Sequence, residues 1–196
     1  MTPTLEAIAE ALAAGGVVGV PTDTVYGIAC RPDDARALAR IYAVKRRPGG
    51  LEIGLLAASA AQLEPLVEMP PIARRLAAAF WPGVVSLVLT AVPGSGLAVP
   101  RTGTTLMVRV PGHPLLRDLL LRTGPLAVTS ANRHGEAAYA TALEVTERLG
   151  AELDAVLDGG TGDGRGSTII DCTEDPPRVL RPGPVSFDQL RPHLGG

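Results

Sequence analysis

The stretch VVGVPTDTVYGIA, residues 17–29, decides the fold of this chain. Its two apolar runs, residues 17–20 and 25–29, have the length and the branched side chains of buried strands. Pro21 ends the first strand, and the segment Thr22-Asp23-Thr24 forms a polar corner before the second. A polar corner between two buried strands is a candidate binding site, because α/β proteins bind ligands where strands end.

Helix-like and strand-like segments interleave along the rest of the sequence. Apolar residues at helical spacing predict a helix that begins near residue 35 and further helices over residues 5–12, 71–80, 115–121 and 142–149. Strands are predicted over residues 54–58, 85–90, 97–100, 105–110, 125–128, 155–157, 167–171 and 178–180. Several consecutive strands lack a helix between them, so we expect an α/β fold with a mixed parallel and antiparallel sheet.

Length and composition bound the class of protein. The chain has 196 residues and no segment of linker-like composition, so we expect a single domain over residues 1–196. A net charge of -2 indicates that any basic surface is local. An aromatic content of 3% disfavours a base-stacking platform for single-stranded nucleic acid. Residues 1–12 contain neither a basic leader nor a long apolar run, which predicts a cytoplasmic protein without a membrane span.

The cysteines and histidines do not have the spacing of metal ligands. Cys30 and Cys172 lie far apart, each without a Cys or His partner nearby in sequence, so both are expected to be small buried hydrophobes. His113, His134 and His193 are scattered along the chain. The sequence therefore predicts no metal ligands and no zinc held by the protein.

Cations and small polar residues follow several of the predicted elements. Lys45 and Arg47 stand at the end of the helix that begins near residue 35, where they either complement the helix dipole or bind phosphate. Ser130 and Asn132 follow a buried strand, as a turn or as part of a site. Arg109 ends an alternating strand, where an arginine either faces solvent or clamps an anion.

Residues 159–168 form a glycine-rich run, GGTGDGRGST. No Gly-Lys-Ser/Thr follows it, so it is not a Walker loop, and no helix follows it, so it is not a dinucleotide-binding turn. Glycine at this density gives the backbone many conformations. We expect a mobile loop that acts as a lid.

Eight short motifs, taken together, resemble the YrdC/TsaC family of threonylcarbamoyl-AMP synthases. They occur in the family's order and span nearly the whole chain. The motifs are PTDTVYG at residues 21–27, KRRP at 45–48, FWPG at 80–83, VRVP at 108–111, TSAN at 129–132, DGG at 158–160, GST at 166–168 and LRPG at 180–183.

The resemblance implies an enzyme and its substrates. Such enzymes convert L-threonine, bicarbonate and ATP to threonylcarbamoyl-adenylate and pyrophosphate, the first step of threonylcarbamoyladenosine modification of tRNA. Mg²⁺ is held through the phosphates of ATP. The implied fold is an open, twisted sheet with flanking helices, and the implied partners extend to tRNA and the downstream threonylcarbamoyl-transferase proteins.

The resemblance also assigns residues. The threonine-binding positions are Thr24, Arg109, Val128 and Ser167. The nucleotide-binding positions are Lys45, Arg47, Thr105, Ser130, Asn132 and Arg181. Among the latter, the resemblance gives the chemical step to Lys45, Arg47, Ser130 and Asn132, whose charges and hydroxyl suit phosphoryl groups.

The chain departs from the family pattern at two places. Leu51 and Leu56 stand where many members have an asparagine and a histidine, so the side chains that would touch nucleotide and threonine there are missing. Ala138 replaces a serine, and Arg133 is a candidate to bind phosphate on that side in its place.

Two other functions fit parts of the sequence. A non-catalytic RNA-binding module of the same fold would present Lys45, Arg46, Arg47 and Arg133 to an RNA backbone. A carbamoyl-adenylate domain of the hydrogenase-maturation kind is the other alternative. Such domains belong to long chains with acylphosphatase and zinc modules, and neither module is present in these residues.

Overall fold

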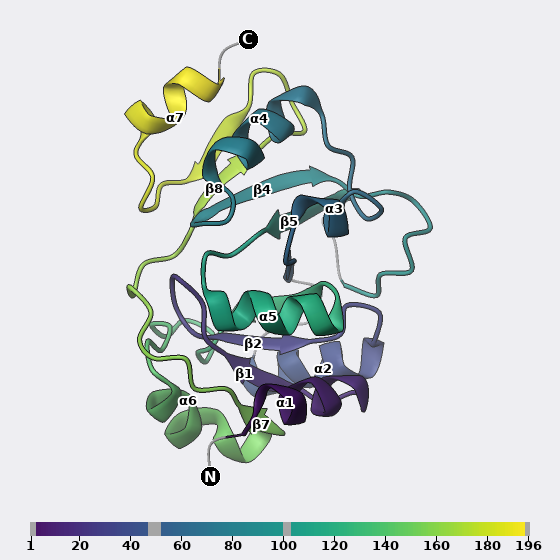
Figure 1. Ribbon diagram of the computed structural model, residues 1–196, viewed down its shortest axis with the longest axis vertical. Helices are drawn as coiled ribbons and strands as arrows, with labels where there is room; N and C mark the ends of the chain where they lie inside the picture. The colour runs from purple at the N-terminus through teal and green to yellow at the C-terminus, as the bar shows by residue number, and fades with distance from the viewer. Residues whose placement is uncertain (1–2, 47–51, 100–102, 195–196) are drawn as a thin grey trace.

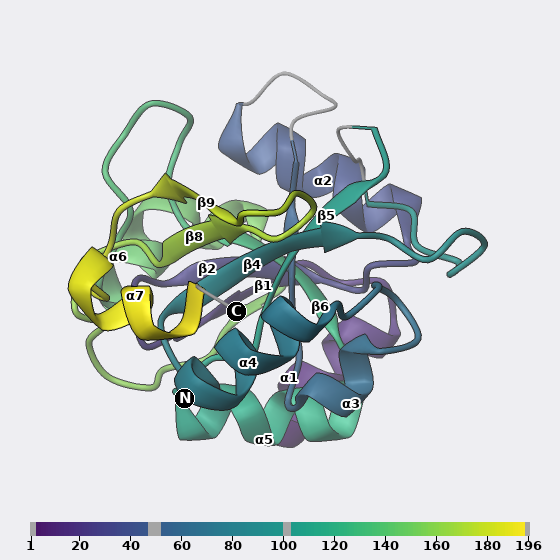
Figure 2. The same ribbon diagram turned by 90° about the horizontal axis from the view of Figure 1, so that it is seen from above.

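The computed structural model describes residues 3–46, 52–99 and 103–194. Within them, nine strands form one sheet in the order β7-β1-β2-β6-β3-β5-β4-β8-β9. The pairs β1·β7, β3·β5 and β4·β8 are parallel, and the other five are antiparallel. The predicted α/β fold, with an open, twisted, mixed sheet and flanking helices, is confirmed (Figures 1 and 2).

The elements have the following bounds. The strands are β1 (Val18–Val20), β2 (Gly27–Cys30), β3 (Gly54–Leu56), β4 (Val85–Thr90), β5 (Thr105–Arg109), β6 (Leu126–Ser130), β7 (Ala155–Val156), β8 (Thr168–Asp171) and β9 (Arg178–Arg181). The helices are α1 (Leu5–Ala13), α2 (Ala35–Lys45), α3 (Ala60–Leu63), α4 (Pro71–Phe80), α5 (Pro114–Thr123), α6 (Ala142–Leu149) and α7 (Phe187–Leu194), with a 3₁₀ turn at Gly150–Glu152.

Local signals in the sequence set the ends of the helices. The Asp34 carboxylate caps α2 by accepting two backbone N–H bonds of its first turn. The same helix ends where Arg46 takes the left-handed conformation, with a φ of 50°. Thr141 and Glu144 form a capping box at the start of α6. The end of α2 matters most, because it fixes the position of Lys45.

Helices cover both faces of the sheet. The larger core cluster packs α2, α4, α6 and α7 against strand residues that include Ile28, Leu55, Leu87 and Val108. A second cluster packs α1 and α5 against strand side chains on the opposite face of the sheet, and Leu116 is fully buried in it. α1 and α5 cover only part of their face, and a cavity lies over the uncovered ends of the central strands.

One predicted strand is absent. Residues 97–99 have no strand structure, and residue 100 lies outside the described part of the chain. The Ala98 N–H donates to the Pro32 carbonyl oxygen (2.8 Å), which belongs to a loop rather than to a neighbouring strand. Apolar character alone therefore did not produce a strand in this segment, because its backbone pairs with a loop and not with a described strand of the sheet.

Other boundaries differ by a few residues. β2 begins at Gly27 rather than at residue 25, because hydrogen bonds of Thr22 Oγ1 hold the preceding residues in a turn. The short helices α3 and α7 were not expected. None of the described helices combines the length and apolar character that a membrane span requires.

Candidate functional site

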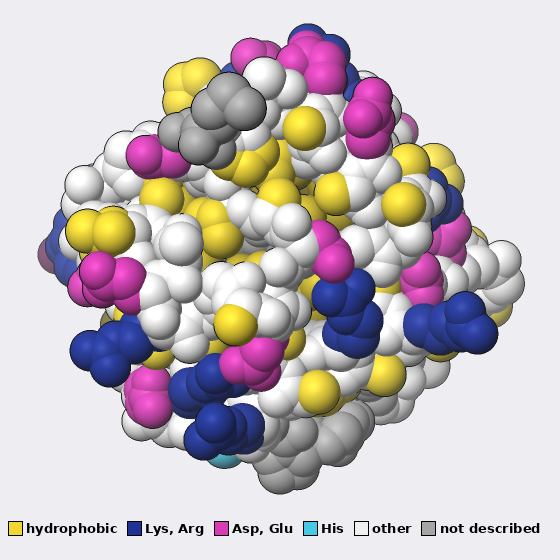
Figure 3. All heavy atoms as spheres, turned by 90° about the horizontal axis from the view of Figure 1, so that it is seen from below, with side chains coloured by type: hydrophobic (Ala, Val, Ile, Leu, Met, Phe, Trp, Pro, Cys, Tyr) yellow, Lys and Arg dark blue, Asp and Glu magenta, His cyan; other side chains and the backbone are white. Residues whose placement is uncertain are grey.

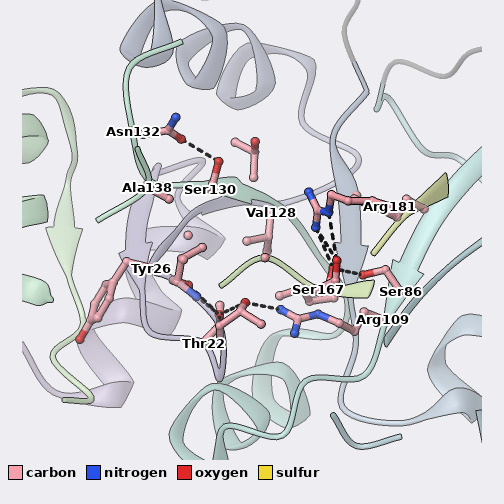
Figure 4. Close-up of a pocket in the computed structure, with 18 of the residues that line it drawn as sticks. Thr22, Tyr26, Ser86, Arg109, Val128, Ser130, Asn132, Ala138, Ser167 and Arg181 are labelled. Carbon is pink, nitrogen blue, oxygen red and sulfur yellow. Dashed lines mark hydrogen bonds between the residues drawn. The ribbon is translucent and has the colours of Figure 1, made fainter. Parts of the chain in front are cut away.

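A cavity of about 600 Å³ opens on the sheet face that α1 and α5 leave uncovered (Figure 4). Strands from both halves of the chain contribute to it, because β6 and β3 lie side by side at the centre of the sheet. The residues of the sequence-predicted site that line it are Thr24, Arg109, Val128, Ser130, Asn132, Ser167 and Arg181. The fold thus brings together residues up to 157 positions apart in sequence, from 24 to 181.

The polar corner between β1 and β2 forms one wall of the cavity. Thr22 Oγ1 accepts the backbone N–H groups of Thr24 (3.0 Å) and Val25 (3.2 Å) and donates to the Val25 carbonyl oxygen (2.6 Å). It also lies 2.9 Å from Thr24 Oγ1. Thr22 therefore fixes the turn and sets the direction of the Thr24 hydroxyl.

Arg109 reaches the same corner from the end of β5. Its Nη1 donates to Asp23 Oδ1 (2.9 Å), and its Nη2 lies 3.4 Å from Thr24 Oγ1. Burial lowers the pKa of Arg109, the charge of Asp23 opposes that effect, and the neighbouring charge of Arg181 lowers the pKa further. Even so, a guanidinium remains protonated at neutral pH. The site therefore contains a fixed cation at its floor.

A second polar network comes from β4, β8 and β9. Ser86 Oγ and Ser167 Oγ lie 2.8 Å apart and are buried. The Arg181 guanidinium donates to the Ser167 carbonyl oxygen from Nε (3.0 Å) and Nη2 (2.8 Å) and to Ser167 Oγ (3.1 Å). Among the described residues, Arg181 forms no ion pair with a carboxylate. Its charge is thus available to an anion in the cavity.

Lys45 is buried and hydrogen-bonded within the protein, whereas a side chain that binds phosphate would face the cavity. Its side chain is 3% exposed, and Nζ donates to the Ser130 carbonyl (2.6 Å), the Asn132 carbonyl (3.1 Å) and Asn132 Oδ1 (2.7 Å). Asn132 Nδ2 in turn donates to the carbonyl oxygens of Arg133 (2.9 Å) and Glu136 (2.7 Å). Lys45 does not line the cavity. It holds the turn that follows β6, and that turn does line it.

The remaining sequence-predicted residues lie elsewhere. Thr105 shares a face of β5 with Met107 and Arg109 but lies beyond the residues that line the cavity. Arg47 falls outside the described residues. The guanidinium of Arg133 is paired with Glu152 and is not part of the cavity lining. A phosphate contact from Arg133 would therefore require this pair to open.

Several residues of the site were not predicted from the sequence. Asp23 was expected only as part of the polar corner. Ser86 was not expected in the site, although it is a polar residue between apolar neighbours of β4. Such a residue on a fully buried strand needs a partner, and this is a usable signal. Glu52 and Glu136 also line the cavity and add two carboxylates to it.

The glycine-rich segment is bonded to the site. The Tyr26 hydroxyl donates to the Gly160 carbonyl (2.9 Å) and accepts the Gly159 N–H (3.1 Å). Further along, the Gly162 N–H donates to the Ala140 carbonyl (3.0 Å), and the Gly164 N–H donates to the Thr24 carbonyl (2.8 Å). The loop thus lies over the polar corner, and its role as a mobile lid stays a prediction.

The side chains that could ligate a metal are dispersed in the described part of the structure. Within the described ranges, His, Cys, Asp and Glu side chains form no group of three or more that could hold an ion. Cys30 and Cys172 are both buried, and burial raises the pKa of each thiol to about 12. Both thiols are therefore neutral and poor metal ligands at physiological pH.

Known proteins resemble this chain in sequence and in fold. The Sua5/YciO/YrdC family model, described as telomere recombination, matches residues 10–183. A Mycobacterium tuberculosis protein is 41% identical over 187 residues, which cover 94% of this chain and 86% of that protein. A Vibrio vulnificus protein named threonylcarbamoyl-AMP synthase is 34% identical over 188 residues, or 93% of this chain and 100% of its own length.

Among solved structures, Pyrococcus abyssi Sua5 complexed with L-threonine superposes with a TM-score of 0.89 at 34% sequence identity. The match covers 97% of this chain and 57% of the archaeal chain, so this chain spans little more than half of that relative. The fold and the site define a class of α/β protein that has an open mixed sheet and, on its uncovered face, a polar cavity lined by Arg109 and Arg181. The chain belongs to the Sua5/YciO/YrdC family.

Proposed function

We propose that this chain is a threonylcarbamoyl-AMP synthase, a nucleotidyltransferase of tRNA modification that uses L-threonine, bicarbonate and ATP. Relatives that match nearly its full length have this name, and a related structure contains L-threonine. The observation that supports it most directly is the cavity itself. Arg109 and Arg181 line it together with the hydroxyls of Thr24 and Ser167.

The proposed threonine site is the corner between β1 and β2. The threonine carboxylate would accept hydrogen bonds from the Nη2 side of Arg109, next to the Thr24 hydroxyl, because Nη1 is already occupied by Asp23. The side chain of Val128 forms the apolar part of this wall and is 8% exposed. An apolar surface beside hydroxyl groups suits a methyl-bearing alcohol.

The proposed nucleotide site is the other end of the cavity. Arg181 supplies a cation there, and polar groups come from Ser130 at the end of β6 and Asn132 in the turn after it. Mg²⁺ would be held mainly by the phosphate oxygens of ATP. Lys45 and Arg47 remain in the proposed catalytic set, Lys45 through its support of that turn.

The chemical step follows from these positions. The ammonium group of threonine loses a proton, and the resulting amine combines with bicarbonate to give a carbamate and water. A carbamate oxygen then attacks the α-phosphorus of ATP, the bond to the bridging oxygen breaks, and pyrophosphate leaves with the electron pair. This step requires alignment of the reactants and neutralisation of charge more than a general base.

A non-catalytic RNA-binding module is the weaker reading. On the face drawn in Figure 3, acidic and basic side chains are interleaved, without one continuous basic surface. Arg133, one of the cations expected to contact RNA, is paired with Glu152.

We further propose that tRNA and the transferase proteins act downstream of the adenylate. We also propose that residues 1–196 form one domain, since both core clusters pack against the same sheet.

The test is pyrophosphate release by the purified protein with ATP, Mg²⁺, bicarbonate and L-threonine. Release should require threonine and bicarbonate, and a product of threonylcarbamoyl-adenylate mass should accumulate with it. Arg181→Ala should raise the KM for ATP, whereas Arg178→Ala, at the other end of the same strand and outside the cavity, should not. Release that is independent of threonine, or its absence with all components, would contradict the synthase function.

A further inference from the structure

Asp23 lies behind the cavity rather than in its lining, and both of its carboxylate oxygens are engaged. Oδ1 accepts from Arg109 Nη1 (2.9 Å), and Oδ2 accepts the backbone N–H of Gly112 (2.8 Å). The side chain of Asp23 is 16% exposed and that of Arg109 is 7% exposed. The pair is therefore largely removed from water, and in that buried position its geometry is strongly constrained.

This arrangement leaves Arg109 with one occupied side and one available side. Nη1 is directed to Asp23, with the Gly83 carbonyl oxygen at 3.5 Å as a second, weaker acceptor. Within the described part of the chain, the hydrogen bond of Nη2 is the 3.4 Å contact to Thr24 Oγ1, which is long for such a bond. Figure 4 shows the Arg109 guanidinium pointing toward the polar corner at Thr22, and its Nη2 is the nitrogen next to Thr24, a residue that lines the cavity.

The carboxylate of Asp23 has little room to move. A Cβ added at Gly112 would lie 3.1 Å from Asp23 Oδ2, closer than most side-chain contacts. The absence of a side chain at residue 112 therefore lets the loop after β5 approach the carboxylate without crowding it. The backbone N–H and the guanidinium grip the two oxygens separately and fix the plane of the carboxylate.

We propose that Asp23 is a positioning residue for substrate binding: it orients Arg109 so that the Nη2 side meets the carboxylate of the amino-acid substrate. This inference rests on the proposed function, because it takes that substrate to be an amino acid. Asp23 also gives Arg109 a counter-ion, so the charge of the buried guanidinium is balanced before the substrate arrives. Asp23 itself touches no substrate.

The experiment compares two ligands that differ at the group Arg109 would bind. L-threonine has a carboxylate, and L-threoninol has a hydroxymethyl group in its place. Calorimetry on wild-type protein and Asp23→Asn measures the Kd of each. In the variant, the Kd of L-threonine should rise by about 10- to 100-fold, the loss typical of a misplaced binding group, while those of L-threoninol and ATP stay unchanged. Asp33→Asn, which breaks an exposed ion pair with Arg31, is the matched control.

If Asp23 had only a structural role, Asp23→Asn would weaken the binding of L-threonine and L-threoninol equally, and that result overturns the inference. An unchanged Kd of L-threonine in the variant also overturns the inference. In that case the proposed function still stands if the wild-type protein binds L-threonine. If wild-type protein does not bind L-threonine, the proposed function fails and the inference fails with it. Should Asp23→Asn not fold, Gly112→Ala crowds Oδ2 without removing its charge and should give the same selective loss, of smaller size.

Discussion

Replacing Lys45 with methionine separates a structural support from a phosphate ligand. Methionine keeps the apolar stem but removes the ammonium, so the Ser130 and Asn132 carbonyl oxygens lose the donor that Nζ provides. Asn132 Oδ1 loses it too but keeps the Ser130 hydroxyl at 2.7 Å. Each buried acceptor left unsatisfied costs about 1–3 kcal/mol, and relief of the buried ammonium offsets part of that sum.

The net expectation for Lys45→Met is a loss of about 2–4 kcal/mol in the free energy of unfolding. For a chain of this size that corresponds to a decrease in Tm of roughly 4–16 °C. Urea denaturation followed by circular dichroism measures the first quantity, and calorimetry measures the second. Arg36→Met is the matched control, because Arg36 lies on the same helix and is exposed. Its unfolding free energy should change by no more than about 0.5 kcal/mol.

The alternative role of Lys45 gives the opposite pattern. A direct phosphate ligand, once removed, would leave stability nearly unchanged and would weaken ATP binding. A Lys45→Met protein as stable as wild type, with strongly reduced ATP affinity, would therefore refute the support role. Under the support role, ATP affinity falls together with stability, because the turn that contains Ser130 and Asn132 loses its anchor.

Three further results are expected. Ser86→Ala removes the hydroxyl partner of the second network and should raise the KM for L-threonine several-fold with little change for ATP, as steady-state kinetics would show. Because burial raises the pKa of the Cys30 and Cys172 thiols to about 12 from 9.0, only the unfolded chain releases these protons in that interval. Stability should thus fall above pH 9, by about 1 kcal/mol per thiol between pH 9 and 10, and a Cys30→Ala, Cys172→Ala variant should lack this loss in pH-dependent denaturation. Hydrogen exchange of the Gly162 and Gly164 amides, already bonded to backbone carbonyls, should slow further with ATP and L-threonine, and equal exchange rates would count against a lid.

Most of the fold could be predicted from the sequence, because local patterns and the tertiary structure agree. The polar cap at Asp34, the capping box at the start of α6 and the alternation of β5 each indicate an element that the structure contains. Residues 97–99 are the exception. Their apolar pattern favoured a strand, but a strand also requires a free edge of a sheet, and that depends on the arrangement of segments distant in sequence.

The site was less predictable, because its residues act through contacts that sequence spacing does not encode. Arg109 and Arg181 were expected as ligands, and both line the cavity. Their difference appears only in three dimensions: Arg109 is balanced by Asp23, whereas Arg181 holds the Ser167 carbonyl and has no carboxylate partner among the described residues.

This difference suggests how one cavity could bind two anionic substrates without mixing them. A cation already paired with a carboxylate has a preset direction and a small net charge, which suits the single carboxylate of an amino acid. A cation without a carboxylate partner suits the larger charge of a polyphosphate. Since the charge of Arg181 also lowers the pKa of Arg109, the two guanidiniums affect each other. A nucleotide that neutralises Arg181 would therefore change the electrostatic environment of Arg109, so we expect the affinities for ATP and L-threonine to depend on each other.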